Sequence, residues 1–586
     1  MIERWSDETT DPADARFARS ASGVLGEFNA AGILTAADVH VAARTAALVG
    51  GADEEAQLAV ALAVRAARAG SVCVDLDELT TTEPDLAWPP GGWLERVAAS
   101  PLAARSVVRI EGDLLYLDRY WREEGQVCDD LLARERLAPP VVNGTSLAER
   151  AERLFPGEGY AEQRAAALAA AARWTTVLTG GPGTGKTTTV AGLLALIAAD
   201  AESPLRIALT APTGKAAARL QEAVEEAQRD QRFIAEDRAR LAGLTASTMH
   251  RLLGWRPGSS TRFAHHRGNK LPHDVIVVDE TSMVSLTMMA RLLEAVRPDT
   301  RLILVGDPDQ LASVEAGAVL ADLVAGLADR GSGAVAALQT THRFGEGIGD
   351  LAQALRDGDP DRVLALLDGG SSRLRWIDPE DDTAMAEVRA RLTAHAAELR
   401  RLALAGDPAG ALAVADAHRL LCAHRDGLWG AEHWNRQLDR ALGELAGTWL
   451  GDWYAGRPVL VTANDYSVGL FNGDTGVAVA APGPNGQESL QVHIAGGGTY
   501  APSRLGAVET LHAMTVHKSQ GSQAREVTVL LPPADSPLLT RELFYTAVTR
   551  AQDRVTVIGS PEALAAAVTR RAQRATGLRR RLGDAS

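Results

Sequence analysis

The feature that most constrains this sequence is a glycine-rich loop, Gly180-Gly181-Pro182-Gly183-Thr184-Gly185-Lys186-Thr187. It fits the pattern G-x-x-x-x-G-K-[ST] at every fixed position, between a β-type segment, TTVLTG, and a helical segment, TTVAGLLALIAA. Glycines allow the backbone N–H groups of such a loop to surround phosphate oxygens, and the following helix directs its positive N-terminus at them. The loop therefore predicts a nucleotide phosphate site in an α/β fold.

Short apolar runs separated by helical stretches surround this loop. Three of them end in polar or small residues: RIALTAP at 206–212, VIVVDE at 275–280 and RLILVGD at 301–307. This alternation predicts a parallel sheet with helices on both faces, and such sheets bind ligands at the carboxyl ends of their strands. We expect the polar residues of all three runs to lie along one edge of the sheet.

The order of helical and β-type segments divides the chain into four parts. Residues 1–118 are mostly helical and contain no catalytic constellation, so we expect a docking or structural domain, joined by a linker at 119–160. Residues 161–345 form the first α/β domain and 346–586 the second. Within the second, three β-type runs separated by Asn-Gly and Gly-rich turns predict a small all-β insertion at about 455–510, with a hairpin turn at FNGD (471–474).

Five residues account for ATP binding and hydrolysis in this interpretation. Lys186 reaches the β- and γ-phosphates, and the Thr187 hydroxyl ligates Mg²⁺. Asp279, at the end of VIVVDE, completes the Mg²⁺ shell, and Glu280 polarises the attacking water. Gln310, in GDPDQL, senses the γ-phosphate or orients water. The alternative for Gln310 is a structural Asp-Pro turn.

Phosphoryl transfer also requires positive charge at the transition state, and two arginines are candidates for it. Arg343 lies in THRFG and Arg550 in FYTAVTRA, each following a different α/β region. Residues so far apart in sequence can meet in a cleft between two domains, which ATP would then close. The alternative for each arginine is a surface salt bridge.

Composition narrows the class of protein. The three cysteines, Cys73, Cys128 and Cys422, form no C-x-x-C pair, which fits a reducing compartment. No apolar run is long enough for a membrane span, and the N-terminus has no signal-type stretch, so we expect a cytoplasmic protein. The net charge of −15 does not by itself indicate a nucleic-acid-binding protein. The arginine-rich tail at 570–581 is interpreted as a solvated or frayed terminus, with contact to nucleic acid or an acidic partner as the alternative.

The order of the motifs resembles that of the superfamily 1 DNA helicases. The segments are APTGKAAARLQE (211–222), STMHRLLG (247–254), VVDETSMV (277–284), GDPDQLASVEAG (306–317), THRFG (341–345), VHKSQGSQ (516–523) and ELFYTAVTRA (542–551). Within that class the chain is most similar to the RecD family, the alpha chains of exodeoxyribonuclease V (RecBCD). The resemblance is dense over roughly 160–555, and Thr281 departs from it slightly where relatives commonly have alanine.

This resemblance implies an α/β fold with two RecA-like P-loop motor domains, a small all-β (SH3-like) insertion in the second, and a mixed, mostly helical N-terminal domain. It implies that Gln163 contacts adenine, that residues 180–188, including Thr188, hold the nucleotide, and that Arg343 and Arg550 are arginine fingers. It also implies that Pro212, Thr213, Thr248 and His250 of the first domain contact DNA. In the second domain it implies contact with DNA or coupling through Asn464, Thr515, His517, Ser519 and Gln520. The alternative for His250 is a structural histidine.

The leading hypothesis is therefore an ATP- and Mg²⁺-dependent helicase subunit, moving 5′ to 3′ on single-stranded DNA. By resemblance it works with RecB-like and RecC-like subunits on duplex ends, in double-strand break repair and recombination. One alternative is a free-standing RecD-like helicase, whose longer N-terminal region with helix-hairpin-helix elements has no counterpart in 1–150. The other is a nucleotide-binding regulatory subunit without motor activity. The sequence contains no separate carboxylate cluster for a nuclease site.

Overall fold

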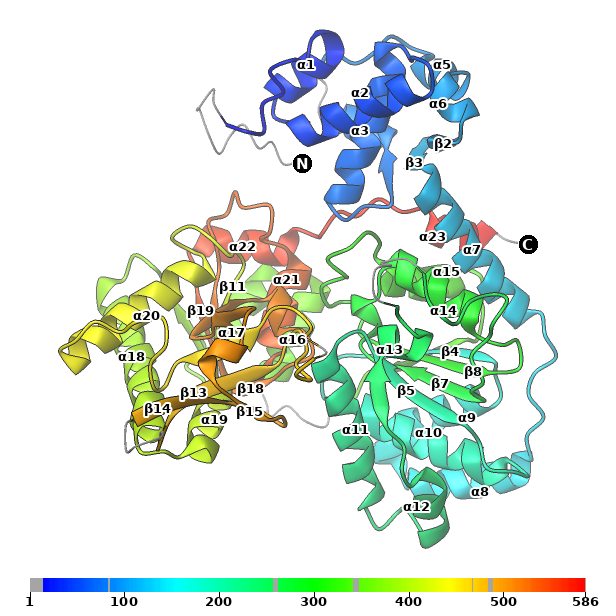
Figure 1. The fold of residues 1–586 in the computed structure, drawn as a ribbon. Helices are drawn as coiled ribbons and strands as arrows, with labels where there is room; N and C mark the ends of the chain where they lie inside the picture. The colour runs from blue at the N-terminus through cyan, green and yellow to red at the C-terminus, as the bar shows by residue number, and fades with distance from the viewer. Residues whose placement is uncertain are drawn as a thin grey trace.

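Two parallel sheets dominate the structure, a computed structural model that describes residues 14–82, 85–256, 262–340, 347–465, 467–482 and 488–584 (Figure 1). The described residues also form two smaller antiparallel sheets, one near the N-terminus and one inserted in the second half of the chain. Arg343 lies outside the described residues.

The N-terminal region packs helices around a small antiparallel sheet with strand order β1-β3-β2. Its elements are α1 (Gly23–Ala30), α2 (Ala36–Leu48), α3 (Glu54–Arg68), β1 (Cys73–Asp75), α4 (Leu76–Thr82), α5 (Trp93–Ala98), α6 (Pro101–Ala104), β2 (Val108–Glu111) and β3 (Leu114–Leu117). The side chain of Asp53 caps α3 by accepting from the backbone N–H of Ala56. The long helix α7 (Asp118–Glu135) leads from this region and packs against α14 of the next.

The first α/β region has a six-stranded, all-parallel sheet with strand order β6-β5-β7-β8-β4-β9. Its strands are β4 (Thr175–Gly180), β5 (Ile207–Ala211), β6 (Ala246–Thr248), β7 (Val275–Val278), β8 (Arg301–Gly306) and β9 (Val335–Leu338). Its helices are α8 (Gly144–Leu154), α9 (Ala161–Ala171), α10 (Lys186–Asp200), α11 (Gly214–Gln228), α12 (Ala235–Leu241), α13 (Met249–Leu253), α14 (Leu286–Ala295) and α15 (Val319–Asp329).

The central strand β7 shows why helices must cover both faces of this sheet. All four of its residues are buried. Val275 and Val277 belong to one hydrophobic cluster, while Ile276 and Val278 belong to another on the opposite face, because alternate residues of a strand point to opposite sides. An apolar run without alternation is the pattern of a strand buried on both faces, so this part of the α/β prediction is confirmed.

The second α/β region repeats this plan with a five-stranded parallel sheet of strand order β10-β19-β18-β11-β17. Its strands are β10 (Leu374–Ile377), β11 (His418–Cys422), β17 (Ala513–Thr515), β18 (Ala524–Leu530) and β19 (Ala551–Ile558). Its helices are α16 (Ile348–Asp357), α17 (Pro360–Asp368), α18 (Asp382–Leu404), α19 (Pro408–Ala417), α20 (Ala431–Ala446), α21 (Arg541–Val548) and α22 (Pro561–Thr569).

Between α20 and β17 the chain forms a separate antiparallel sheet of strand order β15-β14-β13-β12-β16. Its strands are β12 (Pro458–Val461), β13 (Thr475–Pro482), β14 (Glu488–Ile494), β15 (Thr499–Tyr500) and β16 (Val508–Thr510). They fall within the range predicted for a small β insertion. The FNGD segment forms a turn that leads into β13, in which the N–H of Asp474 donates to the carbonyl of Phe471 over 3.0 Å.

The C-terminal tail differs from its prediction. Helix α23 (Leu578–Asp584) packs against α15 and α7 (Figure 1), although the second domain was predicted to run to residue 586. Leu578 and Leu582 are buried there, and Arg579 pairs with Asp329 at 2.8 Å. The tail is not frayed, because apolar burial and internal carboxylates hold it against the protein, although Arg571, Arg579 and Arg580 remain exposed to solvent.

Two smaller expectations can also be compared with the structure. Cys73, Cys128 and Cys422 are all free and buried. None of the helices in the described ranges combines the length and apolar character that crossing a membrane requires.

Candidate nucleotide site between the two parallel sheets

The polar residues predicted to share one edge of the first sheet do so. The glycine-rich loop follows β4, Asp279 follows β7 and Asp307 follows β8, and these strands are parallel neighbours in the order β7-β8-β4. Gly183 and Gly185 have φ values of 81° and 82°, a left-handed conformation that favours glycine. The loop therefore folds tightly enough to place Lys186 at the first position of α10.

Lys186 turns its ammonium group back over the loop. Its Nζ donates to the carbonyl oxygens of Gly180 at 2.6 Å and Gly181 at 2.9 Å. Burial lowers the pKa of Lys186, and the carboxylates of Asp307, Glu280 and Asp279 act in the opposite direction. The ammonium thus lies in an acidic site where phosphate oxygens can replace the carbonyls as its partners.

Asp279 and Glu280 show two further features that are typical of a functional site. Burial raises the pKa of Asp279, and the neighbouring Glu280 carboxylate raises it further. Glu280 has φ 50°; among the described non-glycine residues, Ser106 alone shares a positive φ. Such backbone strain concentrates at functional sites. A cation between these residues and a phosphate would relieve the repulsion between the two carboxylates.

A hydrogen-bond network joins the two α/β regions beside this edge. The Oδ2 atom of Asp307 accepts from Gln310 Nε2 at 3.0 Å and from the Tyr545 hydroxyl at 2.9 Å. Nη2 of Arg550 donates to Oε1 of Gln310 at 2.8 Å, across 240 positions of sequence. Burial lowers the pKa of Arg550, whose exposed fraction is only 3%. Gln310 and Arg550, predicted separately, are therefore in direct contact.

Sequence reasoning missed two residues of this network. Tyr545 reaches Asp307, and Thr546 accepts through its hydroxyl from the backbone N–H of Leu311 at 2.8 Å. Both lie in ELFYTAVTRA, on the helix that ends just before Arg550. Their closeness in sequence to Arg550 was the available signal, since Nε of Arg550 donates to the carbonyl of Thr546 at 3.1 Å.

Gln163 lies on the other side of the loop. It is buried, and its Nε2 donates to the carbonyl of Thr184 at 3.2 Å. The Thr184 hydroxyl in turn donates to the carbonyl of Gly181 at 2.9 Å. Thr187 and Thr188, in the first turn of α10, are half-buried. The predicted nucleotide residues therefore surround one loop.

The candidate DNA residues of the first region lie at the carboxyl ends of β5 and β6. Pro212 and Thr213 follow β5, and Thr248 ends β6, its neighbour. The hydroxyls of Thr213 and Thr248 accept from the N–H groups of Ala216 and Arg251, which caps α11 and α13. His250 is exposed at the end of this segment, and partial desolvation still lowers its pKa. We find structural duties for both threonines at the edge that also holds the nucleotide loop.

The candidates of the second region separate into two groups. Asn464 and Thr515 accept backbone N–H bonds from Asn472 and Lys518, at 2.8 and 3.3 Å. Burial lowers the pKa of His517.

Ser519 and Gln520 are buried and donate to protein carbonyls, Gln520 to that of Leu311 in the first region at 2.9 Å. The contact of Gln520 favours coupling between the regions over direct contact with DNA.

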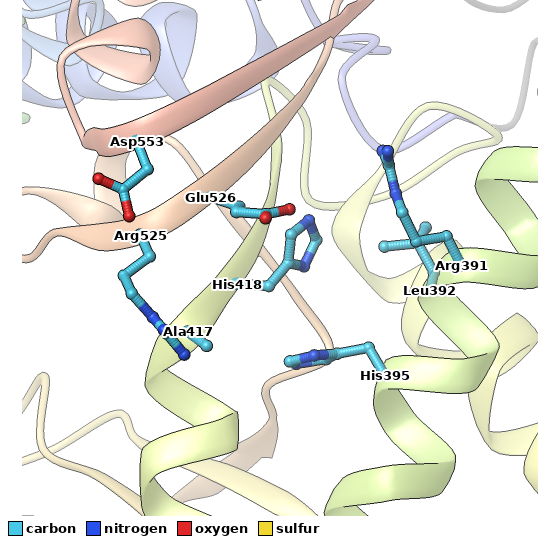
Figure 2. A pocket seen from close by; sticks show the side chains of 8 residues that line it. All are labelled: Arg391, Leu392, His395, Ala417, His418, Arg525, Glu526 and Asp553. Carbon is cyan, nitrogen blue, oxygen red and sulfur yellow. The ribbon is translucent and has the colours of Figure 1, made fainter. Parts of the chain in front are cut away.

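A cavity of about 250 Å³ lies elsewhere in the second region, between α18 and the sheet (Figure 2). Its walls are Arg391, Leu392, His395, Ala417, His418, Arg525, Glu526 and Asp553. The rings of His395 and His418 lie 5.4 Å apart, and burial lowers the pKa of both. The cavity contains none of the predicted site residues.

Three segments of the chain match known protein families. Residues 163–316 match the AAA domain family, 510–558 the UvrD-like helicase C-terminal domain, and 30–115 the N-terminal domain of RecBCD enzyme subunit RecD. The first match covers the glycine-rich loop, Asp279, Glu280 and Gln310, and the second covers Arg550.

Relatives match almost the whole chain. The RecBCD enzyme subunit RecD of Mycolicibacterium smegmatis is 60% identical over 563 residues, which cover 94% of this chain and 98% of the relative. That of Mycobacterium tuberculosis is 58% identical over 580 residues, covering 97% and 98%. The ATP-dependent RecD2 DNA helicase of Deinococcus radiodurans is 33% identical over 493 residues, covering 82% of this chain but 60% of the relative. This chain therefore belongs to the RecD family of RecBCD enzyme subunits and is an ATP-dependent helicase of superfamily 1.

Proposed function

We propose that this chain is the motor subunit of a RecBCD-type helicase–nuclease, and that ATP hydrolysis between its two α/β regions drives it along single-stranded DNA. The observation that carries this proposal is the bond between Gln310 and Arg550 beside Lys186. It joins the phosphate-binding edge of one region to an arginine of the other, so a nucleotide there can control how the two regions meet.

Mg²⁺ fits the donor set at this site. Thr187 supplies a hydroxyl and Asp279 a carboxylate, which are the hard oxygen ligands that Mg²⁺ prefers. The described residues include no cluster of three or more His, Cys, Asp or Glu able to hold a metal. A Mg²⁺ ion held by Thr187 and Asp279 would complete its shell with phosphate oxygens and water. Bound there, Mg²⁺ would neutralise phosphate charge during transfer.

The protein residues have distinct roles in the proposed cycle. Lys186 and the loop N–H groups bind the β- and γ-phosphates, and Gln163 contacts adenine. Glu280 polarises the attacking water and Gln310 orients it. Arg550 stabilises the transition state, together with Arg343 by resemblance. Loss of the γ-phosphate would then weaken contact between the regions and allow one step along the strand.

The remaining assignments rest on family resemblance. We propose 5′-to-3′ movement, with DNA held by Pro212, Thr213, Thr248, His250, Asn464, Thr515 and His517, and with Ser519 and Gln520 coupling the two regions. Residues 1–118 would dock RecB-like and RecC-like subunits, the insertion at about 455–510 would be SH3-like, and the complex would act on duplex ends in the cytoplasm during double-strand break repair. The lower identity to the RecD2 relative, 33% against 60% and 58% for the RecBCD subunits, makes a free-standing helicase the less favoured alternative.

The first test is the ATPase rate of the full chain, with and without single-stranded DNA, beside a Lys186→Gln variant. Strong stimulation by DNA that the variant abolishes would establish a translocating motor centred on this loop. If DNA has no effect, the assay is repeated with RecB-like and RecC-like subunits. Stimulation only in their presence would mean that the partners complete the motor, and continued absence would favour a regulatory subunit.

A further inference from the structure

A second arginine of the second α/β region reaches the nucleotide loop, and no motif marks it. Arg356 lies in the last turn of α16. Its backbone carbonyl accepts from Nη1 of Arg541, at the start of α21, over 3.3 Å. Its side chain is steadied by Gln353, whose Oε1 accepts from Nη2 at 2.5 Å. The arginine is thus attached to the same helix pair, α16 and α21, that carries Tyr545.

The guanidinium of Arg356 lies directly over Gly181. A methyl group built on Gly181 would lie 3.2 Å from Nη1 of Arg356 and 3.1 Å from the hydroxyl oxygen of Tyr545. Lys186 donates to the carbonyl of this same Gly181 at 2.9 Å. The cation of the first region and a cation of the second therefore converge on one residue of the loop. An alanine at Gly181 would require the side chains of Arg356 and Tyr545 to shift by a few tenths of an ångström.

Within the described residues, Arg356 forms no ion pair that would explain this position. Its Nε is buried without a hydrogen-bond partner, and no carboxylate of the described residues pairs with the guanidinium. Asp309 is close enough for Arg356 to oppose the rise of its pKa, which burial and then Asp307 raise to about 6. A partly buried guanidinium with an unused donor is costly unless an anion meets it.

We propose that Arg356 binds the terminal phosphate of ATP when the two α/β regions close. This inference rests on the proposed ATP site and adds a residue to it. Lys186 reaches the β- and γ-phosphates from the loop, and Arg356 approaches the same residue from the opposite region. Arg550 differs from it, because Gln310 already occupies one of its donors. Contact with the γ-phosphate makes Arg356 a sensor that separates ATP from ADP.

The test measures the affinities of the full chain for a non-hydrolysable ATP analogue and for ADP, by calorimetry. Charge-assisted hydrogen bonds of this kind predict that Arg356→Ala weakens the ATP analogue by about 10- to 100-fold. ADP affinity should change by less than about threefold, because ADP lacks the phosphate concerned. Arg356→Lys keeps the charge without the fork of donors and should fall between Arg356→Ala and the wild type.

Arg362→Ala is the matched control, because Arg362 is exposed on α17 and pairs with Asp357. It should leave both affinities unchanged. Equal weakening of the ATP analogue and ADP by Arg356→Ala would overturn the proposal and assign Arg356 a structural role, as would no change in either.

Wild-type chain and Lys186→Ala are measured alongside. If the wild type binds neither nucleotide, or Lys186→Ala does not weaken binding, the proposed ATP site itself is wrong. If the wild type binds ATP through Lys186 and Arg356→Ala binds it normally, only the role of Arg356 is refuted.

Discussion

The two α/β regions share a parallel-sheet plan but meet the nucleotide site with opposite ends of their strands. The first presents carboxyl ends: the loop follows β4, Asp279 follows β7 and Asp307 follows β8. In the second, the segments that reach the site enter their strands there, since Gln520 precedes β18 and Arg550 precedes β19.

This difference explains how the two regions divide the work. Carboxyl ends of parallel strands open into loops and helix N-termini, which bind phosphate through the backbone. The second region contributes side chains instead: Arg550, Tyr545 and Gln520 each bond to the segment Asp307–Leu311. We propose that the first region binds the nucleotide and the second senses it.

The largest effect is expected for Arg550, the positive charge that the second region supplies to the proposed site. Arg550→Ala should lower the DNA-stimulated kcat by about 10³-fold, the scale of a transition-state arginine. Steady-state ATPase measurements would show this, with Arg554→Ala as control because Arg554 forms a surface pair with Glu526. A loss below tenfold would contradict the transition-state role and break the proposed division between the regions.

A substitution at Glu280 tests the proposed role of the first region in hydrolysis. Glu280→Gln should reduce kcat by about 10²-fold, because it removes the group that polarises water. ATP binding should persist, since the loop and Lys186 are intact, and calorimetry would check this. Glu222→Gln, on the exposed face of α11, is the control. If ATP binding disappears together with turnover, Glu280 holds the site together rather than acting on water.

A smaller effect is expected at the hydrogen bond from Tyr545 to Asp307, which joins the two regions. Tyr545→Phe removes the bond to Asp307, and a hydrogen bond to a charged group contributes roughly 1.5–3 kcal/mol. We expect kcat/KM for ATP to fall about tenfold. Tyr500→Phe, whose hydroxyl donates to Val468 in the small antiparallel sheet, should leave it unchanged. If kcat/KM falls equally in both variants, the Tyr545 bond contributes to the stability of the fold and not to the reaction.

The smallest effect is expected where the tail meets the first region at the surface. Arg579 and Asp329 form an exposed ion pair, of the kind that solvent and salt screen. Arg579→Ala should leave both Tm and the ATPase rate unchanged, as thermal melting and turnover assays would report. A clear fall in Tm would show that surface charge, and not the burial of Leu578 and Leu582, attaches the tail.

The sequence predicted the first half of the site far better than the second. The glycine-rich loop and VIVVDE are contiguous, and their chemistry follows from local backbone geometry. Arg550 was identified by its motif, but its partner could not be deduced, because 240 positions separate it from Gln310. Arg343 stays a prediction, because it lies outside the described residues.

The partners of the arginine tail could not be predicted for a related reason. When the partners of a run of arginines are unknown, the run is interpreted as a basic surface. Its carboxylate partners, Asp113, Glu111 and Asp329, are contributed by segments hundreds of residues earlier in the chain.

By itself the sequence determined the α/β class, the phosphate-binding loop and the acidic pair after β7. These depend on apolar periodicity, glycine conformation and strand ends, which are properties of neighbouring residues. Only the tertiary structure decided that Tyr545 reaches Asp307, that Arg356 covers Gly181 and that α23 returns to α15 and α7. Such contacts depend on how separate elements pack, and the packing free energy is spread over residues that no local pattern connects.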